Sequence, residues 1–167
     1  MFNFFWLILA VAVLLGIWLG MNRFKASFLS RMSAVANLIN GSIWDNGKVF
    51  GDWSAKAHGT YKGRVVEISE YDRPGYRYSA RQASIELTYR EPKSIERLTD
   101  RQLSEAAMAW NQGVPPHLRD NKGNFYLDRN RAGWKWAHSL PELELISMVL
   151  EQVDRHAADI ERVAGLR

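Results

Sequence analysis

The sequence predicts an α+β protein with a single N-terminal transmembrane helix, followed by a small antiparallel β-sheet that packs with two or three α-helices. Three observations support this class: residues 2–21 form an uncharged apolar run, residues 84–90 alternate between apolar and polar side chains, and residues 143–160 repeat apolar side chains at helical spacing. These patterns are typical of a membrane span, a half-buried strand and an amphipathic helix, respectively.

Residues 1–22 are predicted to be a transmembrane anchor. Apart from Asn3, the apolar run has no polar side chain. Twenty helical residues rise about 30 Å, the thickness of the hydrocarbon core, and a helix satisfies its own backbone hydrogen bonds in lipid. A cleaved signal peptide is the alternative, but no basic residue precedes the run, and Asn22-Arg23-Phe24-Lys25 is a poor cleavage site.

The flanking charges predict how this anchor is oriented. No basic side chain precedes it, whereas Arg23, Lys25 and Arg31 follow it. Because basic residues favour the cytoplasmic side, we expect a single-pass protein of the inner (cytoplasmic) membrane, with the N-terminus outside and the body in the cytoplasm. The absence of cysteine agrees with a cytoplasmic body, since secreted domains often carry disulfides.

The charge distribution indicates which partners are compatible with the body. The 167 residues include 22 Lys and Arg against 18 Asp and Glu, a net charge of +4. Residues 23–97 hold 13 basic and 8 acidic side chains, whereas residues 98–167 hold 9 and 10. An excess of positive charge near the anchor favours anionic lipid headgroups or an acidic protein. No nucleic-acid partner is expected, because no aromatic RNA-binding motif is present.

One face of the predicted anchor carries small residues at every fourth position, namely Ala12, Gly16 and Gly20. Small side chains let two helix backbones approach closely. We therefore expect this face to pack against transmembrane helices of a larger complex or against a second copy of the chain. Trp6 and Trp18 lie toward the two ends of the anchor, where indole rings favour the membrane interface.

Residues 23–41 are predicted to form an amphipathic juxtamembrane helix ending at Asn40-Gly41, because their apolar side chains recur at steps of three and four. Two arrangements are open. In the first, the helix lies in the membrane interface, with phenyl rings in lipid and cations at headgroups. In the second, it is a stalk packed on its own domain. The residues that the first arrangement places at the interface are Arg23, Phe24, Lys25, Phe28 and Arg31.

Residues 42–167 are predicted to form one soluble α+β domain. Strands are expected over residues 48–53, 58–68 and 84–90 and in a short hairpin over residues 125–136. An Asn46-Gly47 turn is expected before the first of them. Helices are expected over residues 99–111 and 139–160, where Thr99 with Gln102 and Ser139 with Glu142 fit capping boxes. The last helix has an apolar stripe and is expected to cover the sheet.

The sequence carries no recognisable catalytic, metal-binding or cofactor-binding motif. Its four histidines are not at metal-ligand spacing, and no cysteine joins them. Phosphate-binding loops, dinucleotide fingerprints, nucleophile elbows and zinc-protease motifs are absent. We therefore expect a protein that is not an enzyme and uses no cofactor. The alternative, an enzyme acting on a membrane-associated substrate, requires a polar pocket in the body.

Two groups of side chains are predicted to form partner surfaces, because Tyr, Trp and Arg are enriched in interface hot spots. The first is a cluster at a Pro-Gly turn, made of Tyr71, Arg73, Tyr76, Arg77, Tyr78 and Arg81. The second is the pair Trp134 and Trp136, which point to the same side of a strand. For this pair, core packing under the last helix is the favoured interpretation, and an aromatic edge that docks on a partner is the alternative.

The layout resembles small bacterial proteins with one membrane helix and an α+β cytoplasmic body. It is also similar to accessory subunits of large membrane assemblies, such as photosynthetic or respiratory complexes. The resemblance is one of architecture and assigns no functional residue. It implies a non-catalytic, membrane-anchored subunit that packs against a larger complex and braces its cytoplasmic face. A peripheral scaffold or sensor of anionic membranes is the alternative.

Overall fold

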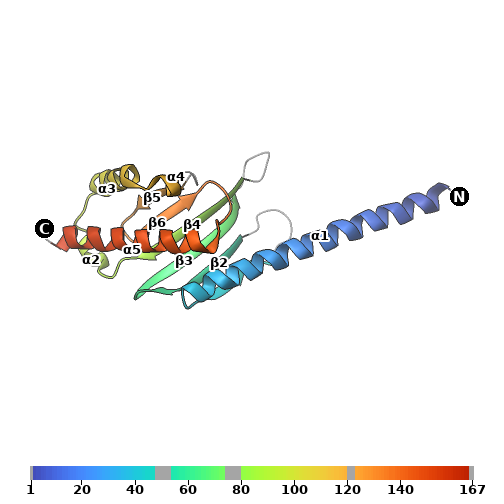
Figure 1. The fold of residues 1–167 in the computed structure, drawn as a ribbon, viewed down its shortest axis with the longest axis horizontal. Helices are drawn as coiled ribbons and strands as arrows, with labels where there is room; N and C mark the ends of the chain where they lie inside the picture. The colour runs from blue at the N-terminus through green and yellow to red at the C-terminus, as the bar shows by residue number, and fades with distance from the viewer. Residues whose placement is uncertain (1, 48–53, 74–79, 120–122, 166–167) are drawn as a thin grey trace.

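The computed structural model describes residues 2–47, 54–73, 80–119 and 123–165 (Figure 1). It confirms an α+β fold with an antiparallel sheet and an apolar N-terminal helix. The elements, in chain order, are α1 (Phe2–Leu38), β1 (Ser42–Asp45), β2 (Ser54–Tyr61), β3 (Arg64–Arg73), β4 (Ala80–Thr88), α2 (Pro92–Ile95), α3 (Asp100–Gly113), α4 (Pro116–Arg119), β5 (Gly123–Leu127), β6 (Arg131–Trp136) and α5 (Leu143–Gly165).

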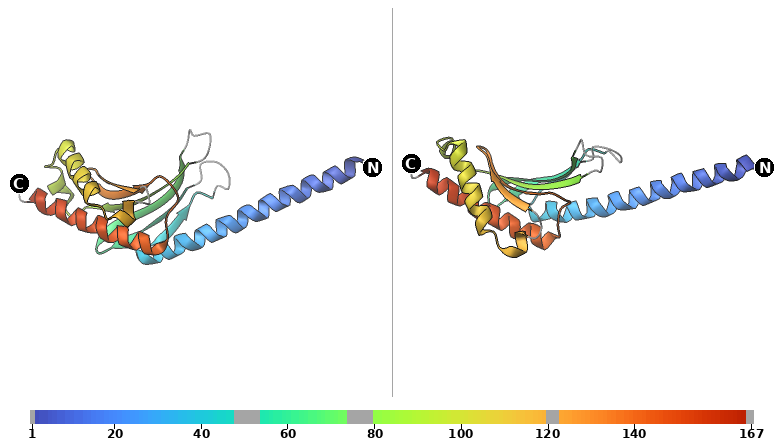
Figure 2. Two further views of the ribbon diagram at one scale, coloured as in Figure 1. Left: turned by 45° about the horizontal axis from the view of Figure 1, so that its top comes forward. Right: turned by 90° about the horizontal axis from the view of Figure 1, so that it is seen from above.

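The six strands form one antiparallel sheet in the order β1-β2-β3-β4-β6-β5. The first four follow one another as a meander, and the β5–β6 hairpin extends the sheet through pairing of β6 with β4. Helix α5 lies across one face, and the C-terminal half of α1 packs beside it against β1 and β2 (Figures 1 and 2). The expected position of the last helix on the sheet is therefore confirmed.

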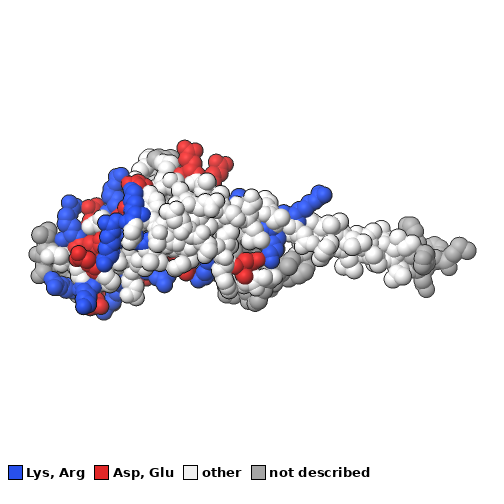
Figure 3. Space-filling model, turned by 90° about the horizontal axis from the view of Figure 1, so that it is seen from below, with Lys and Arg blue, Asp and Glu red and all other residues white. Residues whose placement is uncertain are grey.

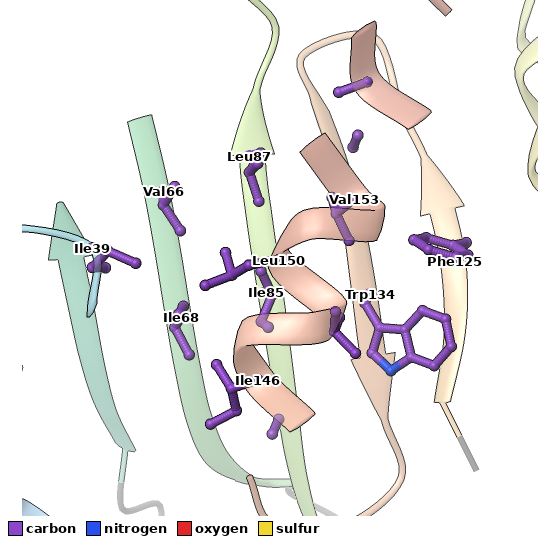
Figure 4. Close-up of a cluster of buried hydrophobic side chains, with 14 of the residues drawn as sticks. Ile39, Val66, Ile68, Ile85, Leu87, Phe125, Trp134, Ile146, Leu150 and Val153 are labelled. Atoms are coloured by element: carbon purple, nitrogen blue, oxygen red, sulfur yellow. The ribbon is translucent and has the colours of Figure 1, made fainter. Parts of the chain in front are cut away.

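The hydrophobic core lies between this sheet face and α5. The register places Ile68 opposite Ile85, and Ile85 opposite Trp134, so that neighbouring strands direct apolar side chains to the same side. Leu150 and Val153 of α5 point down onto these strands (Figure 4). All five side chains are fully buried. Burial of each such side chain contributes about 1.5–3 kcal/mol, which fixes the helix to the sheet.

Helix α1 is unbroken from the apolar run into the core. Residues 6–20 are all exposed, whereas Phe28, Met32, Val35 and Ile39 are buried against the body. The structure thus shows the second of the two arrangements considered above, a helix packed on its own domain. The assignment of Phe28 to the membrane interface is wrong, because its ring is only 1% exposed and belongs to the core cluster.

The strands of the meander differ in their bounds from the expected ones. The single strand expected over residues 58–68 is two strands, because Lys62 and Gly63 form a tight turn with φ of 48° and 79°. Two successive residues with positive φ are the requirement of a type I′ hairpin turn. Asn46-Gly47 is not such a tight turn, since β1 ends at Asp45 and β2 begins at Ser54. The strand expected over residues 48–53 lies outside the described residues.

The helix starts were predicted with mixed success. At α3, Thr99 and Gln102 form both hydrogen bonds of the expected capping box. Helix α5, however, begins at Leu143 and not at Ser139, and its first helical hydrogen bond runs from the N–H of Ile146 to the carbonyl of Glu142 (3.1 Å). Leu140 precedes Pro141, which disfavours a helical backbone at Leu140, and the N–H of Leu140 donates to Glu70 of β3 (3.1 Å). Leu143 was expected in the apolar stripe and is 44% exposed.

Candidate functional surfaces

The apolar half of α1 is the largest uncovered hydrophobic feature of the described chain. By length and composition it is the one described helix able to cross a membrane, and no part of its most apolar stretch is buried. Ala12, Gly16 and Gly20 all lie in this exposed stretch, and a Cβ added at either glycine meets nothing within 4 Å. Trp6 and Trp18 are each 59% exposed. A neighbouring helix therefore has room to approach this face closely.

Basic side chains lie where the apolar part of α1 meets the body (Figure 3), but those that follow the apolar run have different environments. Arg23 is exposed, whereas Lys25 is half-buried and forms a salt bridge of 2.8 Å with Asp45 at the end of β1. The exposed Arg31 guanidinium lies 5.8 Å from the ring centroid of Phe28, within reach of a cation–π contact. The side chain of Phe24 lies outside the described part of the chain. The basic residues expected at the membrane interface therefore do not behave alike: Arg23 and Arg31 are exposed, whereas Lys25 pairs with an acidic side chain of the same protein.

The two members of the predicted Tyr/Arg cluster whose contacts the structure describes, Tyr71 and Arg81, lie on opposite faces of the sheet. The hydroxyl of Tyr71 donates to Gln82 (3.2 Å) on the sheet face away from α5, whereas Arg81 approaches Glu70 (3.5 Å) on the opposite face. Side chains alternate between the two faces of a strand, so neighbouring pairs in the register point in opposite directions. Tyr76, Arg77, Tyr78 and the Arg73 side chain lie outside the described residues.

Trp134 and Trp136 are core residues, so their assignment to a partner surface is wrong. They are 0% and 1% exposed beneath α5. The ring of Phe125 packs edge-on against Trp134 at 4.6 Å between centroids, and the two indoles lie 6.1 Å apart. Neither indole N–H has an acceptor among the described residues. Both indole rings are buried because the alternation of side chains along β6 places them on the same sheet face as Ile85, and α5 covers that face.

The sheet face away from α5 carries pairs of polar side chains that satisfy one another. Lys56 bonds Glu67 at 2.8 Å, and Glu86 accepts hydrogen bonds from Tyr126 and Arg131. Burial alone would raise the pKa of Glu86, but these two donors hold it below its usual range. Burial and the Glu86 carboxylate raise the pKa of Tyr126. The Tyr126 hydroxyl therefore stays protonated at neutral pH, where it acts as a structural hydrogen-bond donor and not as a general base.

A buried arginine was missed at the level of the sequence. Arg64 is 1% exposed and forms hydrogen bonds with Glu161 (2.8 and 2.7 Å) and Asp154 (2.8 Å) of α5. Burial tends to raise the pKa of Glu161, but the Arg64 guanidinium holds it low. Two features of the sequence could have predicted this ion pair. Arg64 is in the same alternating series as Val66 and Ile68, which face the core, and Asp154 and Glu161 are seven residues apart on the inward side of the last helix.

A small cavity of about 120 Å³ lies where α1 meets the start of α5. Its walls are mostly apolar, with Phe28, Met32 and Ile146 among them, and its one fully buried charged side chain is Glu70. Burial raises the pKa of Glu70, opposed by the N–H of Leu140 and by the nearby Arg81. The cavity is smaller than the 300–1,000 Å³ typical of substrate pockets.

The described residues contain no group of three or more His, Cys, Asp or Glu side chains arranged to hold a metal ion. His58 is exposed on β2, and His156 stacks on Trp110 at 4.3 Å between ring centroids. No protein family, curated protein or solved structure matches this chain. Function is therefore inferred from the geometry of the chain itself.

Proposed function

We propose that this chain is a non-catalytic, membrane-anchored accessory subunit. The apolar half of α1 packs against transmembrane helices of a larger membrane complex, of which photosynthetic and respiratory complexes are the architectural analogues, and the body braces the cytoplasmic face. One observation carries the proposal: α1 is a single helix that is apolar and uncovered over residues 6–20, yet part of the hydrophobic core from Phe28 onward.

The unbroken helix supports a bracing role because it leaves no flexible linker between anchor and body. The α1 side chains buried in the core are Phe28, Met32, Val35 and Ala36, and this part of the helix contacts β1, β2 and α5. At the end of α1, a Cβ on Gly59 of β2 would collide with the backbone of Ile39, so helix and strand are in direct contact. Because α1 is packed in this way, the orientation of its apolar half relative to the sheet is fixed. The body would therefore hold one fixed position beside the anchor.

The alternative of a peripheral scaffold on anionic membranes draws on the exposed Arg23 and Arg31. Two of the side chains expected to bind lipid in this alternative are engaged within the protein, because Lys25 pairs with Asp45 and Phe28 is buried. A self-dimer through Ala12, Gly16 and Gly20 uses the same exposed face as a hetero-complex. A self-dimer and a hetero-complex can be distinguished by the size and the protein composition of the assembly recovered from solubilised membranes.

The test is gentle solubilisation of native membranes, followed by identification of what co-migrates with this chain. We expect stoichiometric recovery with a larger complex, and a loss of that recovery in Gly16→Leu and Gly20→Leu. Ala10→Leu is the matched control, since it adds the same side chain on a different face of the exposed helix. Unchanged recovery in the glycine variants, or migration as a lone monomer, would contradict the proposal.

A further inference from the structure

We propose that the body stands directly on the membrane, with one end of its sheet in contact with the lipid headgroups that surround the anchor. This inference rests on the proposed membrane anchoring of α1. The contacting surface, called the membrane-facing end below, is formed by Arg23, Lys25, Trp44 and Asp45. Its partner is the phospholipid headgroup layer of the same membrane.

The first argument is the short distance between the apolar run and the body. Met21 is the last residue of the run, and Lys25 follows four residues later, which is about 6 Å along a helix. The headgroup layer on each side of a bilayer is roughly 5–7 Å thick. Lys25 therefore lies in that layer when the run fills the hydrocarbon core. Its 2.8 Å salt bridge with Asp45 brings the end of β1 to the same level.

The second argument is where burial begins along α1. Residues 6–20 are exposed, but Met21 and Lys25 are half-buried, and they lie on the same face of the helix as the buried Phe28 and Met32. Coverage of α1 thus starts at the final residue of the apolar run. No spacer turn separates the body from the membrane.

The third argument is the direction of the strands. The chain reverses after α1, because β1 begins at Ser42, next to the end of the helix, and ends at Asp45, which lies 2.8 Å from Lys25. Strand β1 therefore runs back along α1 toward its apolar half. Helix α5 runs the other way, and its C-terminal end is the part of the body farthest from the N-terminus (Figures 1 and 2). The β1 end of the sheet consequently faces the membrane.

The chemistry of the membrane-facing end suits headgroups. Arg23 is exposed and has no acidic partner among the described residues, so its guanidinium is available to a lipid phosphate. Trp44 is 54% exposed, and an indole favours the interface because it combines an apolar ring with an N–H donor. The carboxylate of Asp45 is neutralised by Lys25, which removes its repulsion from anionic lipids.

The full chain has no cysteine, so single cysteines can report the distance of chosen sites from the membrane. We would label Trp44→Cys, Leu143→Cys and Val163→Cys in liposomes and measure energy transfer to an acceptor dye on the lipid headgroups. Leu143 and Val163 are a matched pair, each 44% exposed, near opposite ends of α5 and about 30 Å apart along the helix. We expect transfer to be strongest at Trp44 and stronger at Leu143 than at Val163.

A fourth site separates failure of this inference from failure of the anchor. Leu14→Cys lies in the middle of the apolar run, where the side chain is 65% exposed, and its label should be quenched by quenchers attached to lipid acyl chains. Equal transfer from Trp44 and Val163, with Leu14 quenched, would overturn the proposed contact and leave the anchoring intact. Absence of quenching at Leu14 would overturn both.

Discussion

Arg64 and Glu161 form a bidentate ion pair inside the body, with Nη1 of Arg64 2.8 Å from Oε1 of Glu161 and Nη2 2.7 Å from Oε2. Bidentate guanidinium–carboxylate pairs fix geometry as well as charge. This pair connects the first residue of β3 to the C-terminal half of α5, and the Nε of Arg64 adds a bond to Asp154. The far end of the body is therefore held by buried charges, whereas the centre of α5 is held by apolar packing.

Arg64→Ala should lower the free energy of unfolding by about 3–5 kcal/mol, because removal of one partner leaves buried carboxylates without a counter-charge. The measurement is urea unfolding of the full chain in detergent. Arg162→Ala is the control, since Arg162 and Asp159 form a solvent-exposed pair whose loss should not be measurable. Equal effects of the two variants would show that the Arg64 pair does not hold α5.

The buried Glu70 should make stability depend on pH. Burial raises its pKa above the ordinary value of 4.5, so the folded protein binds this proton more tightly than the unfolded chain does. The resulting stabilisation is complete below pH 4.5 and is lost as the pH rises through the raised pKa. In Glu70→Gln this loss should be absent. The check is the difference in unfolding free energy between wild type and variant from pH 4 to 8; a constant difference would contradict the prediction.

Gly123 should not tolerate a side chain. A Cβ at this position would collide with the indole ring of Trp134, which is fully buried in the core. Overpacking of this kind costs about 1–3 kcal/mol, so Gly123→Ala should lower the urea midpoint. Gly113→Ala, at the end of α3, meets no atom within 4 Å and should leave stability unchanged or slightly higher. A neutral Gly123→Ala would mean that the ring shifts freely.

The side chain of Asn111 protects the β5 edge of the sheet. Its amide accepts from the N–H of Phe125 (2.8 Å) and donates to the carbonyl of the same residue (2.9 Å), as a neighbouring strand would. Asn111→Leu should cost about 1–3 kcal/mol, because two backbone groups lose their partners, and should increase aggregation through the open edge. Light scattering on mild heating measures the second effect. Asn124→Ala, at an exposed side chain of the same strand, should show neither.

Local sequence signals predicted the elements that are marked by a side-chain pattern along the chain. The alternation of Ile85, Leu87 and Tyr89 identified β4, and the Thr99–Gln102 pair identified the start of α3. The start of α5 was placed too early because Ser139 and Glu142 match a capping box, whereas Leu140 precedes Pro141 and so disfavours a helical backbone; the first helical hydrogen bond is instead accepted by the carbonyl of Glu142. The turn at Lys62-Gly63 was missed because its composition is a weaker signal than Asn-Gly.

The sequence by itself determined the apolar N-terminal helix, the α+β class and the apolar face of each amphipathic element, because those features depend on side-chain periodicity along a few turns or strands. Only the tertiary structure decided what covers each face. It placed Phe28 and Trp134 in the core and joined Arg64 to Glu161 across 97 residues. Periodicity shows which side of an element avoids water, but the side chains that cover it come from distant segments and are fixed only when the whole core packs together.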